Sequence, residues 1–300
     1  MKLKSIFMIK VATVWTMVLL ASCATAQGRL TRESIEFSQA GQHQKAFEKI
    51  ESAIASGEGM DPLTWYVKAY VLKSIFVERE GRHPDSQMRT ESIAAAMESA
   101  RLDPEGRVAE RREPLLSFLA DTHLEDANHA LAMSQPGDAH WSRDHFEAYV
   151  RINQHLQPNW DSTPDAVLLE QQLAEYAFVQ AETQEQSQAG PWFKWGQVCY
   201  QNAIALGHDA FRSEYNLAVH TYNQGVRQFK AAEDDLDAVD TALKMAAILW
   251  TEAAEGLESA IALDPKQRNG YEALTIVSEA LLNQDRIAWC KANLAELGKR

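Results

Sequence analysis

The chain has 300 residues, of which 46% are hydrophobic, and it carries a formal net charge of −13. A negative charge of this size disfavours nucleic acid and anionic lipid as the main partner, because both are polyanions. Only 14 Gly and 9 Pro are present. A protein built of strands needs more of these residues for its turns, so the composition favours helices throughout.

The N-terminal segment has the sequence pattern of a signal peptide. A basic stretch over residues 1–10 is followed by an apolar run over residues 11–20. That run is too short to span a bilayer and has the length of a signal-peptide core. We therefore predict an exported protein.

Two cleavage sites follow the apolar run. The sequence LASC at 20–23 is similar to a bacterial lipobox, in which Cys23 becomes the lipidated first residue. The sequence ATA at 24–26 fits ordinary signal peptidase. We predict a signal peptide with lipobox over residues 1–22, with cleavage after residue 26 as the alternative. The expected location is the periplasm or the outer membrane, with membrane contact only through a lipid anchor if Cys23 is modified.

A helix-end signature recurs along the rest of the chain. The sequence ESAIALDP at 258–265 ends in Asp-Pro. Such a pair stops a helix, because Pro lacks an amide proton and disfavours the α conformation in the residue before it. The first five letters return as ESAIA at 51–55, and the ending returns as LDP at 102–104. This recurrence predicts internal repeats.

Residues 28–57 carry the spacing of two short helices that cross closely. An aromatic residue and a turn glycine are followed by a small, a large and a small residue at i, i+4 and i+7. These positions are Phe37, Gly41, Ala46, Ile50 and Ala53. The pattern resembles the tetratricopeptide repeat, a helix-turn-helix unit of about 34 residues. The Pro that ends the unit in that family is replaced here by Glu58.

The same resemblance identifies a second unit between Trp65 and Pro104, with a polar insertion over residues 77–90 that is predicted to be a loop. The repeat pattern is degenerate over residues 107–189. Helices are predicted in that region over residues 107–133, with an interruption near Pro114, over 141–156 and over 165–186.

The pattern is clearer toward the C-terminus. Residues 192–199 match a first helix, and residues 203–207 close that unit. The strongest first-helix match lies at 215–225, and its partner helix ends at Pro265. An acidic run over residues 233–237 separates the two, so both are predicted to be longer than usual. A final pair is predicted over residues 267–282 and 286–297.

We therefore predict an all-α fold, an α-α superhelix of antiparallel helix pairs over residues 28–300. The lengthened pair is similar to that of exported tetratricopeptide-repeat proteins of Bacteroidetes-type bacteria. Because each repeat touches only its neighbours, Cys199 and Cys290 are predicted to be buried apolar residues and not a disulfide.

The sequence contains no enzyme signature. It has no His-Glu-x-x-His helix, no Gly-x-Ser-x-Gly elbow and no Walker-type phosphate loop. We expect neither enzymatic activity nor a cofactor. Four histidines lie close together among acidic residues, namely His123, His129, His140 and His145. Because they show no four-ligand spacing, we predict no metal site.

The resemblance implies a binding face. In tetratricopeptide-repeat proteins the first helices of the pairs line a concave surface that binds segments of other proteins. Transferred by position, this face holds Tyr66, Tyr70 and Lys73 in the second unit, and Arg212, Tyr215, Val219, Tyr222 and Asn223 in the extended unit. The predicted function is a non-enzymatic scaffold or adaptor of the bacterial cell envelope, with other envelope proteins or peptides as partners.

A carbohydrate-binding surface lipoprotein is the alternative. Exposed aromatic side chains can stack on sugars, and Trp141, Trp160 and Trp192 are the candidates. Their exposure around one groove would favour a glycan, whereas a groove lined by Tyr and Asn would favour a peptide.

Overall fold

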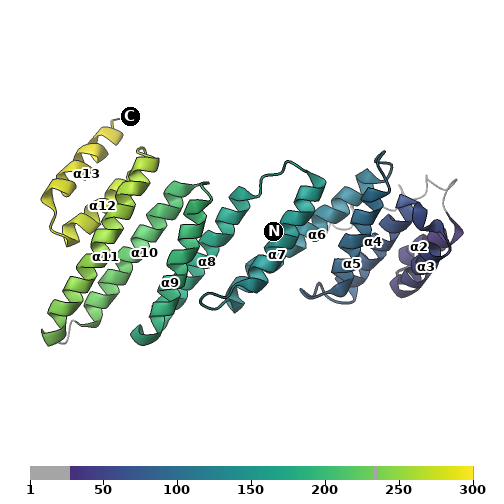
Figure 1. Ribbon diagram of the computed structural model, residues 1–300, viewed down its shortest axis with the longest axis horizontal. Helices are drawn as coiled ribbons and strands as arrows, with labels where there is room; N and C mark the ends of the chain where they lie inside the picture. Colours follow the sequence, from purple (N-terminus) through teal and green to yellow (C-terminus); the bar gives the residue numbers. More distant parts are fainter. Residues whose placement is uncertain (1–27, 233–235, 300) are drawn as a thin grey trace, which may run out of the picture. The chain divides into compact units, whose positions relative to one another are not determined.

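The computed structural model of the chain describes residues 28–232 and 236–299 (Figure 1). The predicted signal peptide and Cys23 lie outside these ranges. The α-helices are α2 (Arg29–Gln39), α3 (His43–Ala55), α4 (Pro62–Glu78), α5 (Gln87–Arg101), α6 (Ala109–His129), α7 (His140–Leu156), α8 (Thr163–Thr183), α9 (Gln186–Ala205), α10 (Ala210–Ala231), α11 (Leu236–Leu263), α12 (Arg268–Ala280) and α13 (Gln284–Leu297). Short 3-10 helices cover Glu58–Met60 (η2) and Ala130–Met133 (η3).

The predicted all-α fold class is confirmed. No strand occurs in the described ranges, and sequential helices pack side by side as the pairs α2–α3, α4–α5, α8–α9, α10–α11 and α12–α13 (Figure 1). This is the arrangement of a helical-repeat protein, in which each pair buries its apolar faces against its neighbours. No helix in the described part of the chain is long and apolar enough to cross a membrane.

The helices form two compact units. Among the described residues, unit 1 comprises 28–126 and His145–Trp160, and unit 2 comprises Ala127–Asp144, 161–232 and 236–299. Each unit has its own buried core, and the two are described separately.

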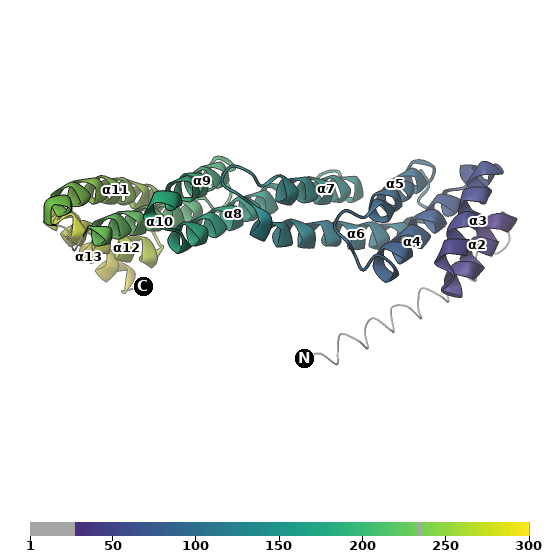
Figure 2. The same ribbon diagram turned by 90° about the horizontal axis from the view of Figure 1, so that it is seen from below.

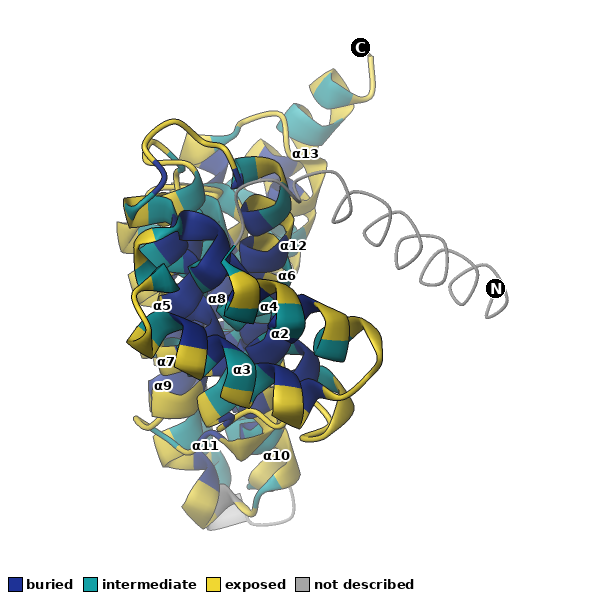
Figure 3. Ribbon diagram, turned by 90° about the vertical axis from the view of Figure 1, so that its right-hand side faces the viewer, coloured by how far each residue is buried: buried dark blue, intermediate teal, exposed yellow. Residues whose placement is uncertain are grey.

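The first pair of unit 1 has the predicted packing. Ala46, Ile50 and Ala53 of α3 are all fully buried. The Ser34 hydroxyl of α2 donates a hydrogen bond of 2.7 Å to the Ala46 carbonyl, which is possible because small residues let the helices approach closely. The buried sides of α2, α3 and α4 face one another in Figure 3.

Glu58, which occupies the place of the family's terminal Pro, has a structural role. Its carboxylate accepts hydrogen bonds from the backbone amides of Leu30 and Thr31, at 3.1 and 2.9 Å, and from the Thr31 hydroxyl at 2.7 Å. It therefore caps the N-terminus of α2, whose first amides have no partner within the helix. Burial opposes ionisation of Glu58, but these hydrogen bonds outweigh it and hold the pKa of the carboxyl below its usual value.

Two predicted boundaries in unit 1 were wrong. The loop between α4 and α5 is shorter than residues 77–90, because α4 continues to Glu78 and α5 begins at Gln87. Ser86 caps α5 by accepting a hydrogen bond from the Arg89 amide. Pro114 does not interrupt α6. It is the sixth residue of that helix, where its missing amide removes one backbone hydrogen bond and the helix continues past it.

In unit 2 the residues predicted to begin a repeat lie on a second helix. The segment from Trp192 to Cys199 belongs to α9, which starts at Gln186, passes through Pro191 and packs against α8. A Cβ atom on Gly196 would lie 2.8 Å from the Phe178 ring of α8. Gly196 is therefore the small residue at a close helix crossing within the α8–α9 pair, which corrects the predicted register.

The lengthened pair is confirmed, with 22 residues in α10 and 28 in α11. Ala253, Leu257 and Ala260 of α11 are fully buried, as predicted. The helix ends at Leu263, directly before Asp-Pro. Of the acidic run, residues 233–235 lie outside the described ranges. Helices α12 and α13 follow beside this pair, close to the predicted bounds (Figures 1 and 2).

The two cysteines of the described residues are free and almost fully buried, as predicted. Burial raises the pKa of the Cys199 thiol to about 12 and also raises that of Cys290.

Candidate functional site

The exposed face of α10 carries three of the predicted binding residues. Arg212 and Asn223 are exposed and Val219 is partly exposed. Their spacing places them on one side of the helix, because positions separated by three, four or seven residues share a face. The side chains of this face are therefore available to a ligand.

The two predicted tyrosines of α10 lie at the edge of this face. Tyr215 is half-buried and stacks on Phe211, with ring centroids 5.9 Å apart and planes 15° apart. Tyr222 is half-buried with its ring 6.1 Å from that of Trp250. Both pack against the core formed by α10, α11, α12 and α13. Only part of each ring can meet a ligand.

A polar cluster that the sequence analysis missed lies on the α8 side of the α10 face. The Glu175 carboxylate of α8 accepts hydrogen bonds from the Tyr200 hydroxyl, from His220 Nε2 at 3.3 Å and from Asn216 Nδ2 at 3.5 Å. The His220 ring lies parallel to the Phe178 ring, with centroids 4.1 Å apart. Side chains of two other helices, α9 and α10, thus hold this carboxylate of α8.

The electrostatics of the cluster keep Glu175 ionised. Its hydrogen bond with His220, followed by that with Tyr200, holds the pKa of Glu175 below its usual value, although burial opposes this. Burial and the neighbouring carboxylate raise the pKa of Tyr200. With 47% of its side chain exposed, Glu175 is an anchored acceptor that solvent or a ligand can reach.

Aliphatic side chains lie exposed on the same helix faces. On α8, Leu168 is 45% exposed and Val179 is 52% exposed, and both share a face with Glu175. Polar acceptors, a guanidinium and aliphatic groups therefore occur together on α8 and α10. We call this set of residues the α8–α10 face: Leu168, Glu175, Val179, Arg212, Asn216, Val219, His220 and Asn223.

The three predicted residues of unit 1 differ in exposure. Tyr66 is only 3% exposed and belongs to the core. Tyr70 and Lys73 are half-buried, and the Lys73 ammonium lies 5.3 Å from the ring centroids of both Tyr70 and Phe118. Burial lowers the pKa of Lys73, despite the opposing charge of Glu78. Cation–π contacts therefore hold Lys73 over two aromatic rings.

The histidines considered for a metal do not converge. His123 and His145 contact each other in unit 1, whereas His140 of unit 2 pairs with Asp138 at 2.6 Å. Asp126 pairs with Arg89. Within residues 28–232 and 236–299, no group of three or more His, Cys, Asp or Glu could hold a metal ion.

The three tryptophans of the glycan alternative have separate surroundings. Trp141 is 42% exposed beside His140. Trp160 is half-buried edge-on to Tyr149, and Trp192 is half-buried against Tyr176 and Trp195.

Comparisons with known proteins identify no family. No family model matches the chain, and no curated protein matches it. Two crystal forms of the nuclear import adaptor Nro1 of S. pombe are similar, with TM-scores of 0.36 and 0.33 and 12% sequence identity in each. Both alignments cover 90% of this chain, and they cover 88% and 90% of Nro1. Similarity this low carries no conclusion about function.

Proposed function

We propose that the chain is a non-enzymatic scaffold of the tetratricopeptide-repeat type, which binds segments of other proteins on the α8–α10 face. The observation that carries this proposal is the anchored carboxylate of Glu175 among exposed aliphatic, guanidinium and amide side chains. Because hydrogen bonds already hold the Glu175 side chain, it loses little side-chain entropy when a partner binds.

The chemistry of the face suits an extended segment. Such a segment presents unpaired backbone amides and carbonyls, which the Glu175 carboxylate and the Asn223 amide can satisfy. Leu168 and Val179 offer apolar surface to its side chains. The alternative of a glycan on Trp141, Trp160 and Trp192 receives less support, because Trp160 and Trp192 are half-buried against other rings.

A double substitution tests the peptide-binding proposal. Partners are captured from the envelope fraction by the mature protein, and the binding segment of each is resynthesised as a peptide for titration calorimetry. The double variant Arg212→Ala/Asn223→Ala should bind the peptide with an affinity lower by about tenfold or more, because each lost polar contact contributes about 0.5–1.5 kcal/mol.

The matched control replaces two exposed residues of α11, Lys244→Ala and Thr251→Ala, which should leave binding unchanged. Equal affinity of the wild type and the Arg212/Asn223 variant for every captured segment would overturn the proposal.

We further propose that the protein is an envelope lipoprotein anchored through Cys23, as the lipobox-like sequence indicates. Mass spectrometry of the mature N-terminus distinguishes the possibilities. A diacylglyceryl Cys23 that disappears in Cys23→Ser supports the anchor, whereas an N-terminus at Gln27 without lipid contradicts it.

A further inference from the structure

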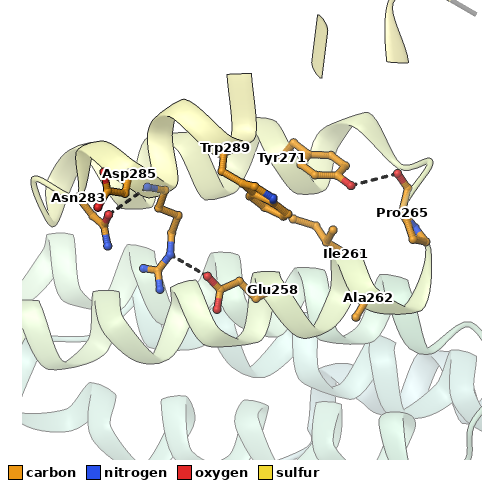
Figure 4. A pocket seen from close by; sticks show the side chains of 9 residues that line it. Glu258, Ile261, Ala262, Pro265, Tyr271, Asn283, Asp285 and Trp289 are labelled. Carbon is orange, nitrogen blue, oxygen red and sulfur yellow. Dashed lines mark hydrogen bonds and ion pairs between the residues drawn. The ribbon is translucent and has the colours of Figure 1, made fainter. Parts of the chain in front are cut away.

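A hollow of about 640 Å³ opens in unit 2 between the end of α11 and helices α12 and α13 (Figure 4). None of its lining residues belongs to the α8–α10 face. Its walls combine an aromatic surface with a polar rim, the combination that is typical of small-molecule sites.

The aromatic surface is exposed but held in place. Trp289 of α13 is 45% exposed, and its ring lies 5.4 Å from that of Tyr271 of α12. Tyr271 is buried, and its hydroxyl donates a hydrogen bond of 3.2 Å to the Pro265 carbonyl. Because Tyr271 is fixed, it supports the indole of Trp289, which points into the hollow (Figure 4).

The polar rim offers both donors and acceptors. Arg286 Nε forms an ion pair of 2.7 Å with the Glu258 carboxylate. The Asn283 side-chain oxygen accepts a hydrogen bond from the Arg286 amide, which leaves the Asn283 NH₂ group as a donor. The Asp285 carboxylate has no hydrogen bond or ion pair among the described residues.

The rim carries two carboxylates, Glu258 and Asp285, and one guanidinium, Arg286, which is paired with Glu258. An anionic ligand would therefore meet an excess of negative charge. A neutral ligand with an apolar face and several hydroxyl groups avoids this repulsion and can use both the donors and the acceptors of the rim. Such a ring can lay its C–H face on the indole and exchange hydrogen bonds with carboxylates, guanidinium and amide at its edge.

We infer that this hollow, the α11–α13 pocket, binds a neutral saccharide with one ring stacked on Trp289. A proline-rich peptide could also stack on the indole, but its proline residues have no N–H or O–H donor for the Asp285 carboxylate, whereas a saccharide offers several hydroxyl donors. The inference does not depend on the proposed peptide-binding function, because it involves other residues.

The test measures binding of oligosaccharides by titration calorimetry and by saturation-transfer NMR. The probes are chitotriose, cellotriose and maltotriose, followed by an array of neutral glycans. At least one of these saccharides should bind to the wild type with a Kd in the micromolar to millimolar range. Trp289→Ala should weaken that binding by about tenfold or more. Asp285→Asn keeps the size of the side chain and should weaken binding several-fold without changing the helical circular dichroism.

Ile248→Ala is the matched control, because Ile248 of α11 is 67% exposed in the same unit but lies outside the pocket, and it should leave saccharide binding unchanged. Three results would overturn the inference: no binding across the array at about 10 mM ligand, a concentration that detects even very weak sites; equal binding by the wild type, Trp289→Ala and Asp285→Asn; or capture of a proline-rich peptide through Trp289 with no saccharide bound.

Discussion

The Nδ1 atom of His123 lies 3.1 Å from the Nδ1 atom of His145, and both imidazoles are buried in unit 1. One ring must donate and the other accept, so the pair fits two neutral imidazoles. Burial, followed by the nearby positive charge of Arg89, lowers the pKa of His123 from 6.5 to about 3. The folded unit therefore resists protonation of His123.

Stability should fall in mild acid as a result. The pKa of His123 is lower in the folded than in the unfolded chain, so its contribution is complete above about pH 6.5 and is lost as the pH falls toward 3. At pH 5 the loss is about 2 kcal/mol. Urea denaturation at pH 7.5 and pH 5 measures this, with His123→Asn as the comparison. An equally steep pH dependence in that variant would show that other groups are responsible.

Removing the negative partner of a buried arginine should be costly. The Arg89 side chain is 1% exposed, and its guanidinium pairs with Asp126 at 2.5 Å. Asp126→Asn leaves that guanidinium buried without a counter-ion, which should destabilise unit 1 by about 3–5 kcal/mol. The measurement is the free energy of unfolding in denaturant. The control is Asp240→Asn, which breaks the exposed pair with Lys244 and should cause no measurable change; similar losses in both variants would contradict the argument.

Gly196 should not tolerate a methyl group. A Cβ at this position would lie 2.8–3.0 Å from three atoms of the Phe178 ring, which is itself stacked against His220. Gly196→Ala should therefore destabilise unit 2 by about 1–3 kcal/mol. Gly298→Ala is the control, because its φ of −75° suits alanine and its nearest neighbour would be 3.6 Å away. Thermal melting compares the two, and an unchanged melting temperature for Gly196→Ala would argue against a close crossing of α8 and α9.

The two buried thiols should be unreactive in the native protein. Cys199 is 1% exposed and Cys290 is fully buried, and burial raises the pKa of both, so little thiolate forms at neutral pH. A thiol reagent such as DTNB should label neither residue until denaturant is added, and both afterwards. Rapid labelling of the folded mature protein, in which Cys23 is blocked or replaced, would contradict this burial.

The sequence predicted the helix pairs well where small residues mark a close crossing. Ala46, Ile50 and Ala53 in α3 and Ala253, Leu257 and Ala260 in α11 all have the burial that their spacing implied. Such positions can be predicted from the sequence because two helices that cross closely admit only small side chains at the crossing.

Register was harder to predict in α9. Trp192, Gly196 and Cys199 have the residue types of a first helix, but a glycine at a crossing does not reveal whether its partner helix precedes or follows it. The contact with Phe178 decides that question. The near-complete burial of Tyr66 could not be predicted either, because α4 is apolar on most sides and its hydrophobic residues show little helical periodicity.

The polar parts of the candidate sites could not be predicted from spacing. Glu175, Tyr200 and His220 come from three different helices, and no local pattern joins them. The same is true of Glu258 and Arg286, which meet only because α13 packs near α11.

The cap that Glu58 places on α2 ties the beginning of the described chain to a residue 28 positions beyond Leu30. The first turn of a terminal helix normally frays, and its amides exchange with solvent ahead of the rest. Here the amides of Leu30 and Thr31 are released only when the turn after α3 opens. Hydrogen exchange should therefore find α2, α3 and η2 opening together as one cooperative segment, without independent fraying of the leading helix.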